Sequence, residues 1–178
     1  MTGAPPAAGT DPERFRALMA RWATGVSVVT AHAGSEDAGL TVNALLSVSL
    51  RPPALLVSVS LDADTLPVVE QSGYFGVSFL AASQRPLSER FARTLPSAEK
   101  FREVGTHRGP HGSPLLDGAL GAAECRLAAR TPAFDHVLLL GEVVHVEAGV
   151  EALPLVYFQS GYAAAEGPDR LRLSTRRA

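Results

Sequence analysis

The sequence predicts a mainly β protein, an antiparallel barrel with a few peripheral helices. Three observations predict it: β-branched and apolar runs recur along the chain, Gly, Pro and polar turns separate them, and few helical segments lie between them that could serve as crossovers. A chain of 178 residues is long enough to bury one core. We therefore expect a single domain over 11–166, with a disordered tail over 1–10 and a flexible tail over 167–178.

The first expected element is a helix that begins at Asp11. An Asp acceptor followed by Pro and Glu is typical of a helix N-terminus. The apolar side chains that follow are spaced at i, i+3, i+4 and i+7, so they share one helical face: Phe15, Leu18, Met19 and Trp22.

The rest of the domain combines strands with short helices. We expect strands over 26–30, 40–50, 54–60, 74–80, 120–130, 136–148 and 154–158. Short helices are expected over 65–71, 86–93 and 97–104, and a loop rich in Gly, His and Pro over 105–114. Strands therefore outnumber helices, which favours antiparallel pairing over a doubly wound parallel sheet.

Composition limits the classes of binding partner and the cellular compartment that we expect. The net charge of -2 gives no basic excess, so we expect neither nucleic acid nor a membrane as a partner. Cys125 is the only cysteine, and the chain shows neither a secretory signal pattern nor an apolar run of about 20 residues. These features predict a cytoplasmic protein.

The sequence lacks the common catalytic motifs, among them the phosphate-binding loop, the dinucleotide-binding glycine fingerprint and the nucleophile elbow. His107 and His111 have the spacing of metal ligands on a helix, but the intervening Gly and Pro argue against a regular helix. A solvated loop is the alternative, and we expect no metal. His136 follows Asp135 at the start of an apolar strand, either as an ordinary strand-end pair or as a polar group at the mouth of a site.

The strand predicted over 40–50 carries small polar side chains at alternating positions. Because side chains alternate between the two faces of a strand, Thr41, Asn43, Ser47 and Ser49 share one face. That face is either simply exposed to water, or it lines a cleft for a polar, planar ligand. Such sites need a few fixed hydrogen-bonding groups on a rigid scaffold.

Seven segments occur in order between residues 14 and 163: FRALMARWATGVSVVT, GLTVNALLSVSLRPP, SGYFGVSFLAASQRPLSERFA, EKF, SPLLDGALGAAEC, DHVLLLGEV and PLVYFQSGY. Together they resemble the flavin reductase-like proteins of the FMN-binding split-barrel fold, the small partners of two-component flavin monooxygenases. The resemblance implies an antiparallel split β-barrel and a homodimer. It also implies FMN or FAD as the flavin and NADH or NADPH as co-substrate.

The same resemblance implies the site residues. Family contacts to the flavin ring and ribityl chain match Thr41, Val42, Asn43, Ala44, Ser47, Val48 and Ser49, with Ser58 on the return strand beside them. Family contacts to the phosphate match Thr65, Phe91 and Ala92, with Lys100 or Arg93 as a cationic group. Helix-start amides and hydroxyls suit a phosphate.

The chain departs from the family pattern at two positions. The resemblance places His136 near the nicotinamide as an orienting group, the one nearly catalytic residue, but Phe134 stands where the family has glycine before the Asp-His pair. The Phe134 ring would fill space that relatives leave open to the nicotinamide. Asp64 precedes Thr65 where many relatives carry serine, and its carboxylate would repel a phosphate unless it points to solvent.

The function implied is an NAD(P)H-dependent flavin reductase that transfers a hydride from nicotinamide C4 to flavin N5 and supplies reduced flavin to a separate monooxygenase. The cofactors carry this chemistry, and the barrel holds the two rings together. Phe134 favours one alternative, a flavin-binding electron carrier without NAD(P)H oxidation. A second alternative is a split-barrel flavin oxidase or oxygenase of a biosynthetic pathway.

Overall fold

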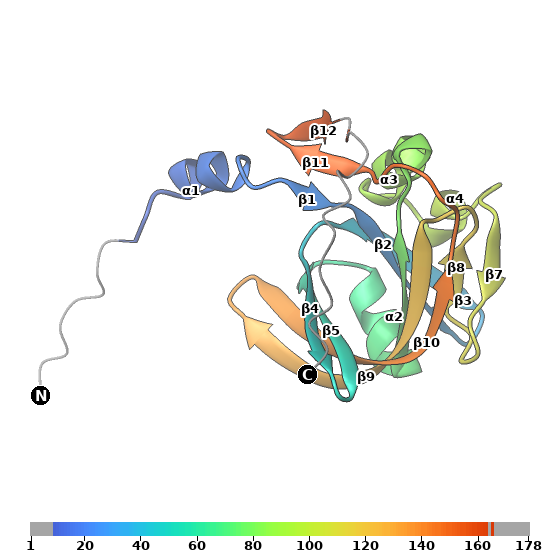
Figure 1. Cartoon of the computed structure of the whole chain (residues 1–178). Helices are drawn as coiled ribbons and strands as arrows, with labels where there is room; N and C mark the ends of the chain where they lie inside the picture. The colour runs from blue at the N-terminus through green and yellow to red at the C-terminus, as the bar shows by residue number, and fades with distance from the viewer. Residues whose placement is uncertain (1–8, 164, 166–178) are drawn as a thin grey trace, which may run out of the picture.

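The computed structural model describes residues 9–163 and 165, and an antiparallel seven-stranded sheet forms its centre (Figure 1). The strand order is β3-β2-β6-β9-β10-β5-β4. The strands are β2 (Ser27–Ala33), β3 (Glu36–Val42), β4 (Leu45–Leu50), β5 (Pro53–Ser60), β6 (Tyr74–Phe79), β9 (Gly121–Ala133) and β10 (His136–Ala148). This architecture confirms the predicted fold class.

The sheet curls into a barrel that stays open along one seam. Strands β3 and β4 are consecutive in the sequence, yet they form opposite edges of the sheet, and the sheet's curl brings β3 close to β5. The chain crosses the seam at Asn43 and Ala44, which belong to neither strand. The result is the split barrel that the sequence predicts.

Two small antiparallel sheets flank the barrel. The first joins β1 (Thr24–Gly25), β11 (Val156–Phe158) and β12 (Gly161–Ala163), so the N-terminal segment is tied to the last strands. The second pairs β7 (Thr106–Arg108) with β8 (Pro114–Leu116). Strand β11 lies within the run predicted over 154–158, whereas β1, β7, β8 and β12 lie outside the predicted strands.

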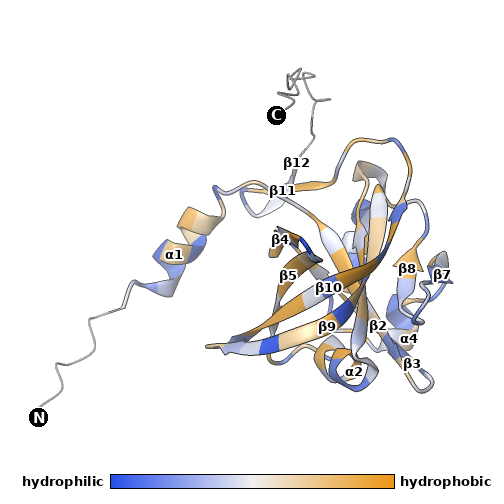
Figure 2. Ribbon diagram, turned by 60° about the horizontal axis from the view of Figure 1, so that its bottom comes forward, coloured by the Kyte–Doolittle hydropathy of each residue, from blue (hydrophilic) through white to orange (hydrophobic). Residues whose placement is uncertain are grey.

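The interior of the barrel is built from β-branched and aromatic side chains. Val29, Val57 and Phe75 are fully buried, and the apolar stretches of β5 and β10 are orange in Figure 2. Helix α2 (Thr65–Ser72) packs against β2. Gly141 of β10 permits close packing, because a Cβ there would lie 2.5 Å from the Phe75 ring.

Helix α1 (Pro12–Met19) begins as predicted, with the Asp11 side chain accepting a hydrogen bond from the Glu13 amide at 3.1 Å. None of its residues is buried, and it projects away from the barrel (Figure 1). The predicted apolar face is therefore present but lies in solvent: Leu18 is 64% exposed. Trp22, 68% exposed, lies beyond the end of the helix.

The remaining helices are short. They are the 3-10 turn η1 (Ala82–Gln84), α3 (Arg85–Phe91) and α4 (Ser97–Lys100), and α3 and α4 both contact β3. Within the described ranges, no helix is long and apolar enough to span a membrane.

Three element predictions are wrong in part. The strand predicted over 40–50 is two strands, because its first half pairs with β2 and its second half pairs with β5 at the other edge. The loop predicted over 105–114 contains β7, and the helix predicted over 97–104 ends at Lys100. Of the predicted tails, residues 1–8 and 167–178 lie outside the described residues.

Candidate functional site

A cleft of about 1080 Å³ lies beside the seam. Its walls come from α1 and the segment after it, the crossing segment, the first residues of β4, the middle of β5 and the start of β10. Most of the wall is apolar, and a few polar side chains interrupt it, among them Thr24, Ser27, Asn43, Ser58 and His136. A site of this volume and composition suits a planar organic ligand with a hydrogen-bonding rim.

Backbone contacts fix the crossing segment at the cleft wall. The Ser58 amide donates to the Ala44 carbonyl oxygen at 3.1 Å, which ties the crossing to β5. Leu45 then pairs with Val57 as β4 begins. Asn43 is thereby held in an exposed position on the wall, outside any strand.

His136 stands at the start of β10, where its backbone pairs with Ser60 of β5 and Ala133 of β9. Its ring Nδ1 donates to Asp135 Oδ1 at 2.8 Å. This hydrogen bond holds the pKa of Asp135 below its ordinary value. Because Nδ1 is engaged, Nε2 is the ring atom that a ligand in the cleft can reach.

Phe134 occupies the tip of the β9–β10 hairpin. Its backbone is in the left-handed region with φ +60°, and its side chain is fully exposed. Phe134 is not part of the cleft wall. Its ring therefore lies in solvent rather than in the cleft.

Four of the sequence-predicted site residues meet in the cleft: Asn43, Ala44, Ser58 and His136. They come from separate parts of the chain, which the crossing and the strands β5 and β10 bring together. The structure thus assembles one part of the predicted flavin site in a single cleft.

The other predicted contacts to the flavin ring lie outside the cleft wall. The Thr41 hydroxyl donates to the Ser88 carbonyl at 2.7 Å, and Val42 is buried in the core. Ser47, Val48 and Ser49 lie farther along the edge strand β4. Strand 40–50 divides at the crossing, so its polar positions do not form one continuous face.

The residues predicted to bind the phosphate are the second predicted group, and two of them contact Gly39 of β3. The buried Lys100 Nζ donates to the Gly39 carbonyl at 3.0 Å, and the Phe91 ring packs so closely that a Cβ at Gly39 would lie 2.8 Å from it. Burial lowers the pKa of Lys100, an effect that the nearby Asp64 carboxylate opposes. One Nζ–H group of Lys100 is therefore already used by the backbone.

Thr65 and Ala92 complete the predicted phosphate set. Thr65 is buried at the first residue of α2, and Ala92 is exposed at the C-terminal cap of α3. Gly39 and Asn43 are four residues apart, roughly 13 Å along an extended chain. Asn43, Ala44, Ser58 and His136 therefore share the cleft, whereas Phe91 and Lys100 meet at Gly39, and the last residues of β3 connect the two places.

The paired histidines of the 105–114 segment have separate structural roles. His107 lies between Asp117 and Glu147, at 2.7 and 2.9 Å, and these hydrogen bonds raise its pKa. The His111 ring stacks on Tyr74 with centroids 4.1 Å apart. Over residues 9–163 and 165, no cluster of three His, Cys, Asp or Glu side chains could hold a metal ion.

The sequence reasoning missed the N-terminal wall of the cleft. Phe15, Met19 and Trp22 line it, whereas their spacing in the sequence predicts only a shared helical face. Thr24 also lines it, and its hydroxyl oxygen is buried without a hydrogen-bond partner. No periodic signal marks Thr24, because a two-residue strand is too short to show one.

The curled antiparallel sheet with a large cleft at its seam defines a small, ligand-binding split barrel. The profile of the flavin reductase like domain matches residues 19–166. The chain therefore belongs to the flavin reductase-like family, as the resemblance in the sequence predicts.

Individual relatives cover almost the whole domain. The reductase component of 4-hydroxyphenylacetate 3-monooxygenase from Thermus thermophilus is 43% identical over 150 residues, 84% of this chain and 94% of the relative. The actinorhodin polyketide dimerase of Streptomyces coelicolor is 40% identical over 155 residues, 86% of each chain. The solved structure of the NADH:FAD oxidoreductase SgcE6 from Streptomyces globisporus C-1027 superposes with a TM-score of 0.83 at 32% identity, covering 92% of this chain and all of that one.

The cleft fits the flavin that this family implies. Its volume and apolar walls accommodate a fused ring, and its wall offers an amide, hydroxyls and an imidazole nitrogen to the polar rim of that ring. One of those hydroxyls, on Thr24, has no partner within the protein. The donor set is therefore chemically matched to an isoalloxazine, which carries several hydrogen-bonding groups on one edge.

Proposed function

We propose that the protein is a flavin reductase that oxidises NADH or NADPH, reduces FMN or FAD, and supplies reduced flavin to a separate flavin-dependent monooxygenase. The observation that carries this proposal is the meeting of Asn43, Ala44, Ser58 and His136, all at family positions, in one cleft of suitable volume. Membership of the flavin reductase-like family supports it, as do relatives named for this activity.

A bound flavin supplies a ring system that accepts a hydride, so the protein need not provide an acid, a base or a nucleophile. The chain's own residues bind and orient the reactants. Asn43 and Ser58 offer hydrogen-bonding groups to the ring, and His136 Nε2 orients the nicotinamide. The apolar wall keeps the two rings together and limits water around them.

The flavin phosphate is assigned to the second group of residues, around Thr65, Ala92 and Lys100. The first-turn amides of α2 and the Lys100 ammonium group favour an anion. The Asp64 carboxylate opposes it, and Asp64 is exposed at the N-cap of α2 without a capping hydrogen bond. Rotation of that side chain toward solvent would leave the amides and Lys100 to the phosphate.

We also propose that the protein forms a homodimer. The apolar face of α1 is exposed, and so are Leu46, Val48 and Leu50 on the edge strand β4. A helix of eight residues is marginal in water without tertiary packing. A second copy of the chain would cover both surfaces in every molecule, whereas a transient oxygenase partner would leave them exposed most of the time.

A cytoplasmic location is also proposed. Cys125 is buried as a free thiol, and burial raises its pKa to about 12. Such a thiol is compatible with a reducing compartment and has no redox role of its own.

The deciding experiment is anaerobic reduction of added flavin, followed by the loss of its visible absorption. Purified protein is mixed with FMN or FAD and with NADH or NADPH, in all four combinations. Rapid catalysed bleaching is expected and identifies the flavin and the donor. Flavin binding without bleaching under any combination would contradict the reductase and favour an electron carrier.

A pair of histidine variants tests the proposed orienting role. His136→Asn should lower kcat/KM for the nicotinamide donor at least tenfold, whereas His145→Asn, on the same strand but outside the cleft wall, should leave it within twofold. Equal rates for the two variants would remove His136 from the site.

The relative named actinorhodin polyketide dimerase favours a second candidate function, flavin-dependent oxidation within a biosynthetic pathway. Product analysis separates it from the first candidate. The protein is incubated with flavin, NADH, oxygen and an electron-rich phenol, without any oxygenase. A phenol that is coupled or oxygenated would favour this second candidate, and an unchanged phenol would exclude it for that substrate.

A further inference from the structure

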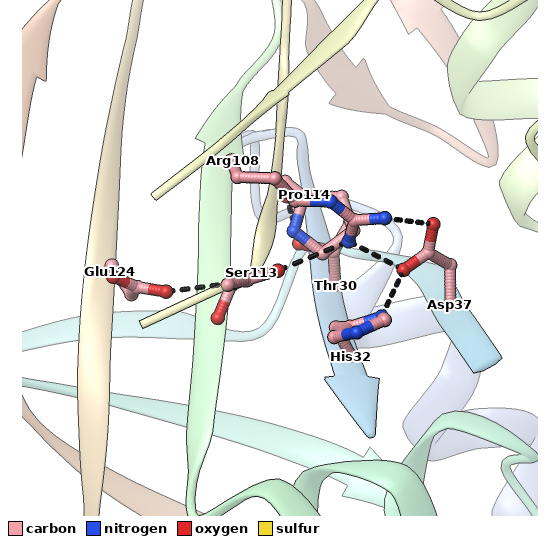
Figure 3. Close-up of polar contacts among 8 residues, drawn as sticks. Thr30, His32, Asp37, Arg108, Ser113, Pro114 and Glu124 are labelled. Atoms are coloured by element: carbon pink, nitrogen blue, oxygen red, sulfur yellow. Dashed lines mark hydrogen bonds and ion pairs between the residues drawn. The ribbon is translucent and has the colours of Figure 1, made fainter. Parts of the chain in front are cut away.

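Two buried side-chain oxygens in the described part of the chain have no hydrogen-bond partner, and they stand in different places. One is Oγ1 of Thr24, a residue that lines the large cleft. The other is Ser113 Oγ, outside the cleft, in the segment that the buried Glu124 carboxylate holds. Figure 3 shows Ser113 beside Glu124.

A buried hydroxyl without a partner opposes folding, because it loses its hydrogen bonds to water and gains none in return. The fold offers no reason for a hydroxyl at Thr24. The residue sits in the two-residue strand β1, where its backbone pairs with Tyr157 of β11. Valine has nearly the same shape and the same preference for extended backbone, and it would avoid the unpaired oxygen.

The surroundings of Thr24 distinguish it from Ser113. Ser27, Asn43, Ser58 and His136 line the same cleft, so Thr24 is one of several polar residues in a mostly apolar wall. Because the Thr24 oxygen is covered in the ligand-free protein, a turn of the side chain toward the cleft is needed for its hydroxyl to donate to an acceptor on a ligand.

We propose that Thr24 Oγ1 is a hydrogen-bond donor to the ligand in the cleft, a contact that positions an amide-type carbonyl on a planar heteroaromatic ring. The flavin ring carries such carbonyls on its polar edge, and the nicotinamide carries one in its carboxamide. This inference rests on the proposed function and adds a ligand-positioning residue to it.

The test uses two Thr24 variants and a matched control. Thr24→Val removes the hydroxyl and keeps the shape, Thr24→Ser keeps the hydroxyl, and Ser113→Ala removes the other unpaired hydroxyl. Flavin affinity is measured by fluorescence titration with FMN and with FAD, and KM is measured for NADH at saturating flavin. The urea midpoint of the ligand-free protein is measured for each variant.

We expect Thr24→Val to weaken ligand binding at least fivefold while its ligand-free urea midpoint stays equal to the parent's or rises. A higher flavin dissociation constant identifies the flavin as the acceptor, and a higher KM for NADH alone identifies the nicotinamide. Thr24→Ser and Ser113→Ala should remain within twofold of the parent in both measurements.

Unchanged affinity and KM in Thr24→Val would overturn the inference, while a parent protein that bleaches flavin would keep the proposed function. A lower ligand-free midpoint in Thr24→Val would also overturn it, because the hydroxyl would then have a partner within the fold. A parent protein that binds flavin without bleaching it contradicts the proposed reductase alone, since the titration still tests Thr24. If the parent binds neither flavin nor NADH, both proposals fail.

Discussion

At the scale of single residues, Phe134 combines a left-handed backbone with a fully exposed aromatic side chain. Ala133 and His136 pair across the hairpin, so Phe134 and Asp135 are the two turn residues, and only Phe134 has a positive φ. The first position of such a turn favours glycine. A left-handed backbone costs an L-residue about 1–2 kcal/mol.

Phe134→Gly should therefore be more stable than Phe134→Ala by about 1 kcal/mol, since both remove the ring and only glycine relieves the backbone. Urea denaturation of the two variants measures the difference. Equal midpoints would mean that the turn carries no strain at this position. Reductase activity should persist in both variants, because the Phe134 ring is not part of the cleft wall.

Asn43 is the residue of the crossing segment whose change tests the cleft most directly. Asn43→Asp keeps the size of the side chain, removes its N–H donors and adds a negative charge. We expect flavin affinity to fall at least fivefold, with no more than a small change in the melting temperature of the ligand-free protein, because the Asn43 side chain is exposed. Fluorescence titration and thermal unfolding provide the two readouts, and an unchanged affinity would remove Asn43 from the site.

At the scale of elements, His107 links the β7–β8 hairpin to β10. Its ring is hydrogen-bonded to Asp117, just after β8, and to Glu147, near the end of β10. Both carboxylates raise the pKa of His107 above the ordinary value of 6.5. His145 also lies near Glu147, at 3.8 Å. Because the folded-state pKa is raised, the contribution of His107 to stability is fully present below pH 6.5 and is lost as the pH rises through that folded-state value.

The urea midpoint of the parent should therefore fall as the pH rises from below 6.5 through the folded-state pKa of His107, and His107→Gln should flatten this part of the profile. The effect is modest and shrinks at high salt, because the cluster is partly exposed. A parent and a variant with parallel profiles would show that the ion pairs contribute nothing to folding.

The elements also show what the sequence could and could not predict. Long β-branched runs such as β5 and the first half of β10 were predictable, because alternate side chains face the interior. The break at Asn43 and Ala44 was not, because β3 and β4 read as one run of apolar and small residues. The partner of each half, β2 or β5, decides where the strand ends. Strand β7 was hidden for a related reason: all three of its residues are exposed, so it forms through pairing with β8 and leaves no pattern of burial.

The part of the candidate site that depends on where the backbone runs was predictable from the sequence. Asn43, Ala44, Ser58 and His136 were found through the family's motifs, and the fold brings them together. Alternation places Thr41 on the same strand face as Asn43, but it does not reveal that the Thr41 hydroxyl donates to the Ser88 carbonyl. The side-chain rotation that commits a hydroxyl to one partner is a tertiary property, which no spacing in the sequence records.

At the scale of the whole molecule, α1 leaves the barrel with its apolar face uncovered. If a second copy covers that face, a charge placed there should separate the subunits. Leu18→Glu is expected to shift the protein from dimer to monomer in sedimentation equilibrium, because burying an unpaired carboxylate against an apolar surface is costly. Leu18 is not part of the cleft wall, so the change leaves the described cleft residues in place.

Ala17→Glu on the same helix is the matched control, because it adds the same charge at an exposed position on the opposite side from the apolar face. It should leave the mass of the assembly unchanged. A parent that sediments as a monomer would contradict the homodimer directly, whatever the variants do.

The crossing segment couples ligand binding to the local opening of the backbone where β4 begins. The Ser58 amide donates to the Ala44 carbonyl at the end of the β4–β5 pairing, so its proton exchanges with solvent only when the start of β4 separates from β5. A ligand that holds Asn43 and Ser58 together closes the route by which deuterium enters at that amide. Slower isotope exchange at Ser58 would thus report an occupied cleft from the backbone alone, in a protein whose chemistry is otherwise followed through the colour of its cofactor.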